Sequence, residues 1–142
     1  MTQEEKDLLL KDLCARLPYN VQVKTEYDDC ISFTWNELKY FTHENKICKP
    51  YLRPMSSMTE EDIQSLFNAM YPNLRMMWYE KETDLIRFRA ADYNNKRFLH
   101  ITLWFNKVYS LEQIDWFNAH HFDYRGLIEK SLAIVALENM YK

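Results

Sequence analysis

The sequence predicts an α+β fold with two antiparallel β meanders and three to four packed helices. Apolar residues recur at helical spacing in some segments and at every second position in others. The segments follow the order helix, strands, helix, strands, helix, without the strand–helix–strand alternation of a parallel sheet. The chain has 142 residues, 47% of them hydrophobic, which suffices for a single domain over residues 1–142. We expect an N-terminal half over 1–58 and a C-terminal half over 59–142.

The first predicted element is a helix over residues 2–16. Thr2 and Glu5 have the spacing of a capping box, which satisfies two free backbone N–H groups of the first turn. Its apolar stripe comprises Leu9, Leu10, Leu13, Cys14 and Leu17. Pro18 ends the helix because it restricts the residue before it and has no N–H to donate.

Residues 19–49 are predicted to form a small antiparallel meander. Two strands alternate between apolar and polar side chains, with apolar positions at Val21, Val23, Ile31, Phe33 and Trp35. The polar residues 27–29 form the expected hairpin turn between these strands. A weaker strand is predicted through residues 38–40, and a further short one near 47–48.

The segment 49–58 is interpreted as an extended connector because it contains Pro50 and Pro54. Thr59 then caps a helix that has an acidic first turn and ends before Pro72. The apolar face of this helix comprises Ile63, Leu66, Phe67 and Met70.

A second antiparallel meander is predicted from strands over 75–80, 84–91 and 97–105, with turns at 81–83 and 92–95. Apolar side chains alternate with arginines on the middle strand, so one of its faces is expected to be buried.

The remaining elements lie near the C-terminal end of the sequence. Ser110 and Gln113 have the spacing of a helix start, and a further short helical segment is expected near residues 127–128. The apolar segment 132–137 is expected to dock as a strand or a further turn.

Glycine is nearly absent, since Gly126 is the only one in the sequence. Average usage would give about ten glycines in a chain of this length. Phosphate-binding loops, the dinucleotide fingerprint and the nucleophile elbow all depend on several glycines. We therefore expect a protein that is not an enzyme, with no catalytic residue and no cofactor.

Charge and cysteine content favour a cytoplasmic protein. The net charge is −3, and no apolar run is long enough for a membrane span. The three cysteines, Cys14, Cys30 and Cys48, are an odd number without metal-ligand spacing, which is typical of reduced thiols. Cys14 is expected in the core, and neither a metal site nor membrane contact is expected.

Two tyrosine–arginine pairs form the first candidate binding site. Aromatic residues make up 15% of the chain, and tyrosine and arginine often anchor protein contacts. The pairs expected to be exposed are Tyr51 with Arg53, and Tyr124 with Arg125. The alternative is that both segments join the two halves of the chain.

A sheet face in the second meander is the alternative candidate, as a single-stranded nucleic-acid interface. Its residues are Arg87, Arg89, Phe98, His100 and Trp104. Aromatic rings stack on bases, and arginines pair with phosphates. The expected pairing places Arg87 near His100 and Arg89 near Phe98. The competing interpretation is that a helix covers part of this face while the arginines pair with Asp84 or Glu82.

Two histidines and an aspartate, His120, His121 and Asp123, suggest a third hypothesis, a metal-dependent hydrolase. His43 and His100 complete the chain's set of histidines, and His100 is a further candidate metal ligand. Adjacent helical residues point about 100° apart, so His120 and His121 converge on one ion only if the helix breaks. The alternative is a helix C-terminus, where histidine suits the helix dipole, followed by Asp123 as the cap of the next helix.

Three stretches resemble a known family. The segments KPYLRPMSSMTEE at 49–61, NAHHFDYRGLIEK at 118–130 and KDLCARLPY at 11–19 are similar to small proteins of gut Bacteroidales that often occur in prophages and other mobile elements. Ser131 and the glycine-free tail depart from the family, where glycine is common. The family has no established activity, cofactor or catalytic residue.

The resemblance implies a bacterial or phage accessory protein rather than a metabolic enzyme. With the weak acid–base motifs, it leads to the first functional hypothesis: a non-catalytic binding protein that acts through contact with an unknown protein partner. Nucleic-acid binding is the alternative, and metal-dependent hydrolysis comes third.

Overall fold

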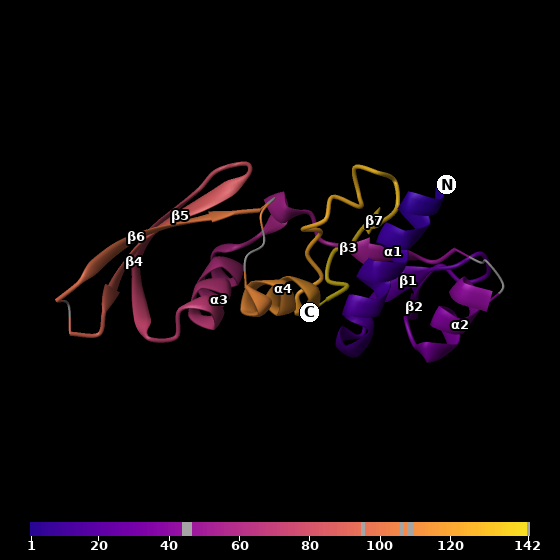
Figure 1. Cartoon of the computed structure of the whole chain (residues 1–142), viewed down its shortest axis with the longest axis horizontal. Coiled ribbons are helices and arrows are strands. Elements are labelled where there is room, and N and C mark those ends of the chain that lie inside the picture. Colours follow the sequence, from indigo (N-terminus) through magenta and orange to yellow (C-terminus); the bar gives the residue numbers. More distant parts are fainter. Residues whose placement is uncertain (44–46, 95, 106, 108–109, 142) are drawn as a thin grey trace. The chain divides into compact units, whose positions relative to one another are not determined.

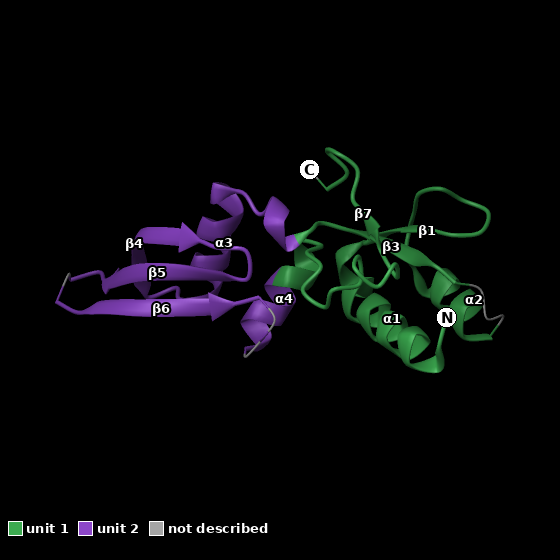
Figure 2. Cartoon of the chain, turned by 90° about the horizontal axis from the view of Figure 1, so that it is seen from above, with its two compact units in different colours: residues 1–54, 117–142 green, residues 55–116 purple. Residues whose placement is uncertain are grey.

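The computed structural model describes residues 1–43, 47–94, 96–105, 107 and 110–141. Within them, four α-helices and two β-sheets form an α+β protein, as the sequence predicts (Figure 1). The chain divides into two compact units (Figure 2): residues 1–54 and 117–142 form unit 1, and residues 55–116 form unit 2. The single-domain expectation stays a prediction.

Helix α1 (Gln3–Arg16) begins unit 1 at the predicted capping box. The Thr2 hydroxyl accepts a hydrogen bond from Glu5 N at 3.1 Å, and the Glu5 carboxylate accepts one from Thr2 N at 2.8 Å. The helix gives way to a short 3₁₀ helix, η1 (Leu17–Tyr19), at the predicted position.

The buried face of α1 differs in part from the predicted stripe. Leu9 and Leu13 are buried, as expected, together with Asp12 and Arg16. Cys14 is exposed, so its predicted place in the core is wrong. The buried positions follow i, i+3, i+4, i+7, and a polar pair takes two of them.

Unit 1 contains a four-stranded sheet in the order β2–β1–β3–β7. The predicted hairpin is confirmed, because β1 (Gln22–Lys24) pairs antiparallel with β2 (Ile31–Ser32). Strand β1 also pairs antiparallel with β3 (Lys49–Leu52), which pairs in parallel with β7 (Ile134–Val135). The pairs among β1, β2 and β3 are thus antiparallel, as predicted, and β7 adds a parallel edge strand from the C-terminal segment.

Helix α2 (Trp35–His43) replaces the strand predicted through residues 38–40. Thr34 N donates a hydrogen bond to the Glu37 carboxylate at 2.7 Å, and the Thr34 hydroxyl contacts the same carboxylate. This spacing of threonine and glutamate marks a helix start. The alternation around Leu38 and Tyr40 favoured a strand and concealed that signal.

The segment 49–58 also departs from its prediction as a connector. It contributes β3, a strand between β1 and β7 in which Tyr51 and Leu52 are buried. Pro50 is the second residue of this strand, near the start where a sheet tolerates proline best. A short 3₁₀ helix, η2 (Met55–Ser57), follows. The strand predicted near 47–48 thus lies two residues further on.

The C-terminal segment of unit 1 forms turns where a helix was predicted near 127–128. The Asp123 carboxylate accepts hydrogen bonds from Leu127 N at 2.8 Å and Ile128 N at 2.9 Å. The helix that Asp123 was predicted to cap is absent, so that prediction is wrong, and the carboxylate holds a turn instead. Strand β7 lies within the apolar segment 132–137, which was expected to be a strand or a turn.

Two positive φ angles in this segment predict substitutions of opposite sign. Gly126 has φ of 71°, and no described atom lies within 4 Å of a Cβ added there. We expect Gly126→Ala to lower the free energy of unfolding by about 1 kcal/mol through backbone strain alone. Ser131 has φ of 59° and is exposed. Ser131→Gly should therefore raise the free energy of unfolding by up to about 1 kcal/mol. Urea unfolding measures both, and a shared sign would contradict the backbone argument.

Unit 2 contains the second meander as predicted. Strands β4 (Leu74–Lys81), β5 (Leu85–Asp92) and β6 (Phe98–Trp104) are antiparallel neighbours in that order. Helix α3 (Glu60–Met70) covers one face of this sheet, where the rings of Phe67 and Phe88 lie 5.1 Å apart.

The helix starts predicted for unit 2 are also confirmed. The Thr59 hydroxyl accepts a hydrogen bond from Asp62 N at 3.2 Å at the start of α3. The Ser110 hydroxyl accepts one from Gln113 N at 3.1 Å at the start of α4 (Leu111–Ala119). In the described part of the chain, no helix combines the length and the apolar character that crossing a membrane requires.

Candidate functional site

The face of the β4–β5–β6 sheet opposite α3 exposes aromatic and charged side chains. Cross-strand pairing arranges them in rows, and one row places Arg89 between Trp78 and His100. The next row consists of Glu80, Arg87 and Thr102. We call the following eight residues the open sheet face: Trp78, Glu80, Arg87, Arg89, Phe98, His100, Thr102 and Trp104.

All five residues predicted for the nucleic-acid interface lie on this face and are exposed. The exposed fraction of the side chain is 59% for Phe98, 51% for Trp78 and 38% for Trp104. Exposed apolar rings that gather on one face are typical of surfaces that bind a ligand or a macromolecule. The structure thus brings together the alternative set of predicted site residues.

The predicted pairing across β5 and β6 is wrong by two residues. Arg87 pairs with Thr102 and Arg89 with His100, whereas Phe98 lies opposite Ala91. The connection has the expected length but begins one residue later, since Asp92 N donates a hydrogen bond to the Arg97 carbonyl across it at 3.2 Å. A shift of two positions keeps every side chain on its predicted face, because the period of a strand is two.

Trp78 is a member of the open sheet face that the sequence analysis missed. The pairing of β4 with β5 is irregular between Met76 and Trp78, where the register shifts. Such a bulge interrupts the alternation of apolar and polar side chains. The run Met76-Met77-Trp78 therefore gave no indication of which face the tryptophan occupies.

The two arginines of β5 differ in their ion pairs. Arg87 forms a close ion pair with Glu82 and lies 3.9 Å from Glu80, so the expected pairing with a local acid is confirmed for this residue. These side chains are about half exposed, so the pairs contribute at most about 1 kcal/mol. Arg89 has no ion-pair partner among the residues that the structure describes. Its guanidinium is available between two aromatic rings.

The tyrosine–arginine pairs proposed for a protein partner take part in contacts inside unit 1. Tyr51 is only 7% exposed, and its hydroxyl donates to the Asp29 carbonyl at 2.6 Å. The Arg53 guanidinium lies 4.1 Å from the centre of the Phe122 ring. The expected exposure of Tyr51 is therefore wrong, because Tyr51 belongs to β3.

The second pair is also held internally. The Tyr124 ring stacks on Phe117 at 5.5 Å, and its hydroxyl accepts a hydrogen bond from Arg125 Nη2 at 2.6 Å. Both side chains are half-buried. Together with the bridge between Arg53 and Phe122, these contacts join segments from both sequence halves within unit 1.

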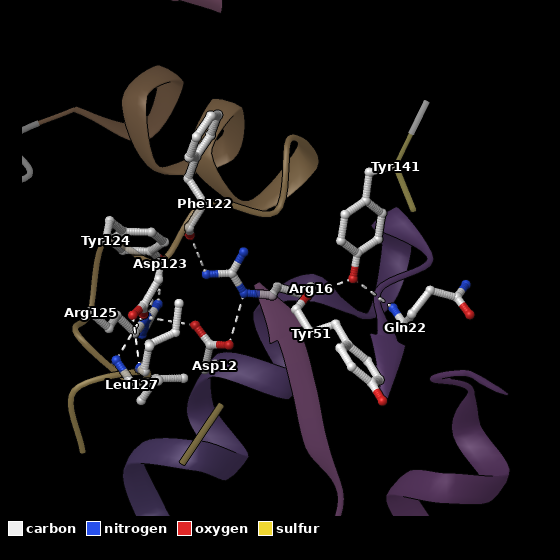
Figure 3. Close-up of polar contacts among 11 residues, drawn as sticks. Asp12, Arg16, Gln22, Tyr51, Phe122, Asp123, Tyr124, Arg125, Leu127 and Tyr141 are labelled. Carbon is white, nitrogen blue, oxygen red and sulfur yellow. Dashed lines mark hydrogen bonds and ion pairs between the residues drawn. The ribbon is translucent and has the colours of Figure 1, made fainter. Parts of the chain in front are cut away.

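Figure 3 shows a buried polar network beneath these contacts. Arg16 Nε donates to Asp12 Oδ2 at 2.8 Å, and Arg16 Nη2 donates to the Phe122 carbonyl at 2.7 Å. Arg125 Nε lies 3.4 Å from Asp12 Oδ1 as a second ion pair. Asp12 and Arg16 are fully buried, so this network ties α1 to the C-terminal segment.

The histidine cluster does not converge on a metal site. Among the residues that the structure describes, no three histidine, cysteine or carboxylate side chains lie close enough to hold one ion. The helix ends at Ala119, and His121 N and Phe122 N donate to the Asn118 and Phe117 carbonyls at 3.3 and 3.0 Å. The helix C-terminus of the alternative interpretation is therefore found at this place, whereas the helix that Asp123 was expected to cap is not.

Comparisons with protein-family models, with curated proteins and with solved structures found no match to this chain. The resemblance to the Bacteroidales proteins therefore stays a prediction.

Proposed function

We propose that this protein is a non-catalytic binding protein and that its open sheet face binds single-stranded nucleic acid. The observation that carries the proposal is the row in which Arg89 lies between Trp78 and His100. An aromatic ring stacks on a base of any sequence, and an adjacent guanidinium pairs with a phosphate. The row supplies both kinds of contact.

Further rings extend the same surface along the sheet. Phe98 lies one row from Arg89 on one side, and Trp104 lies two rows away on the other. Several rings on one antiparallel sheet allow successive bases to stack, which is how sheet-based RNA-binding modules use their aromatic residues.

Positive charges gather at one end of the open sheet face, although the whole chain has a net charge of −3. Lys96 and Arg97 lie in the connection beside Phe98, next to the Arg89 row, whereas Glu80 and Glu82 lie towards the opposite end of the face. We expect phosphates to lie at the Arg89 end, because cations are in excess there.

Fluorescence anisotropy with labelled single strands of about 12 nucleotides tests the proposal. We expect binding at about 50 mM NaCl that weakens steeply at about 200 mM, because each neutralised phosphate releases counterions. Trp78→Ala and Trp104→Ala should each weaken binding about 5- to 150-fold, which corresponds to ~1–3 kcal/mol per stacked base. Arg89→Gln should reduce the salt slope by about 0.7.

Trp35→Ala is the matched control, because Trp35 is a tryptophan of unit 1 that is 68% exposed. Its affinity should equal that of the unmodified protein. Absence of binding at low salt would contradict the proposal and favour a protein partner for the same face. If Trp35→Ala binds as weakly as Trp78→Ala, the loss of affinity is not specific to the open sheet face, and the proposed site is wrong.

A further inference from the structure

Unit 1 contains a hollow of about 280 Å³ that the proposed function does not use. Four separate segments of the unit line it, with Asn20 and Gln22 in the first, Arg53 after β3 in the second, His121 after α4 in the third, and Tyr141 in the last. The volume is at the lower end of the range for small-molecule sites, so it suits a small metabolite rather than a polymer.

His121 is held at the wall of this hollow by its backbone. The two hydrogen bonds that end α4 place it at the position where glycine is the usual residue, with φ of 62°. Its carbonyl accepts a hydrogen bond from Arg53 N at 2.7 Å, which fixes it beside β3. The His121 side chain therefore occupies a position after the helix end where glycine, which has no side chain, is the usual residue.

The imidazole of His121 is buried yet has an unused polar atom. Its ring stacks on Tyr141 with the ring centres 3.7 Å apart, and the residue is 7% exposed. Nδ1 has no hydrogen-bond partner among the described residues. A buried ring nitrogen without a partner is unfavourable. Because Nδ1 is enclosed, the ring must turn slightly before a ligand in the hollow can bind this atom.

The charges around the hollow are positive. Burial, with Arg16, His120 and Arg53 nearby, lowers the pKa of His121 to about 4, so the imidazole is neutral near neutral pH. None of the described residues that line the hollow carries a carboxylate side chain. A guanidinium and a neutral imidazole in a described lining that contains no carboxylate favour an oxyanion.

We propose that this hollow binds a small oxyanion-bearing metabolite, with Arg53 pairing with the oxyanion and His121 contributing a ring nitrogen as a hydrogen-bond partner. Carboxylates and phosphates share this chemistry. The site lies in unit 1, so it is independent of the open sheet face of unit 2 and is tested separately from it.

The test is an NMR titration of the histidine Hε1 resonances with inorganic phosphate, and separately with acetate, against sodium chloride at matched ionic strength. We expect a saturable shift of the His121 resonance with at least one of the two anions. The same anion should raise the melting temperature, because a ligand that binds only the folded state stabilises it. Phosphate alone indicates a phosphorylated metabolite, and acetate alone indicates a carboxylate.

Two variants assign the effect to the site. His121→Asn keeps a residue type that tolerates a left-handed backbone, and should abolish anion-dependent stabilisation. Arg53→Gln should weaken anion binding roughly tenfold through the lost charge. His43→Asn, at an exposed histidine of the same unit, should bind as the unmodified protein does.

The unmodified protein alone can overturn the proposal. If chloride reproduces the shift, or if neither anion gives saturation, the hollow is not an oxyanion site. Anion-dependent stabilisation that persists in folded His121→Asn would also overturn it.

Discussion

Asp12→Ala is expected to lower the free energy of unfolding by about 3–5 kcal/mol. The substitution leaves the Arg16 guanidinium fully buried without its carboxylate partner, from which it lies 2.8 Å away. It also removes the carboxylate that faces the half-buried Arg125. An uncompensated charge in the interior is far less stable than the intact pair. Urea unfolding monitored by circular dichroism measures the loss.

The double variant Asp12→Ala/Arg16→Met separates the pair from its neighbours. Methionine fills much of the volume of arginine without a charge, so the double variant should be more stable than Asp12→Ala alone. It should remain less stable than the unmodified protein, because the Phe122 carbonyl loses the hydrogen bond from Arg16. Additive losses from the two single substitutions would contradict a coupled buried pair.

Acidification is expected to destabilise the protein through His121. Burial, with Arg16, His120 and Arg53 nearby, lowers the pKa of this residue from its ordinary 6.5 to about 4. Between these values the unfolded chain binds a proton at His121 that the folded chain does not, so the free energy of unfolding rises with pH. This contribution is complete above pH 6.5 and is lost as pH falls towards 4, a change of about 3 kcal/mol.

His121→Asn isolates this contribution, because asparagine does not titrate. Between pH 6.5 and 4, its free energy of unfolding should change less than that of the unmodified protein. Glu37 acts at lower pH: burial raises its pKa, but hydrogen bonds from Thr34 and the backbone outweigh burial and lower it below 4.5. An unchanged pH profile in His121→Asn would contradict the assignment to His121.

Local signals in the sequence were sufficient for the elements that local contacts define. The capping boxes at Thr2 and Thr59 and the strands of the second meander lie where the spacing of side chains predicts them. Alternation also predicts on which face of the sheet the nucleic-acid residues lie. This prediction holds although the strand pairing differs by two residues, because side chains alternate with a period of two. A bulge in β4 hid Trp78, because it breaks the period on which the prediction depends.

The environment of the tyrosine–arginine pairs could not be predicted from composition. Tyr51 is buried because β3 lies between β1 and β7, and β7 comes from more than 80 residues further along the chain (Tyr51 pairs with Ile134). A four-residue strand that contains a proline carries no strong local signal of its own. Exposure depends on what packs against a residue, and a single segment does not contain that information.

The sequence by itself determined the α+β class, the starts of α1, α3 and α4, and the alternating faces of the second sheet. Only the tertiary structure decided that Asp12 and Arg16 form a buried pair, since Arg16 reaches a carbonyl 106 positions away. It also decided that His121 is a buried, neutral imidazole beside a hollow. Caps and alternation arise from neighbours within a few residues, whereas burial and pKa depend on charges and side chains that folding brings together from distant segments.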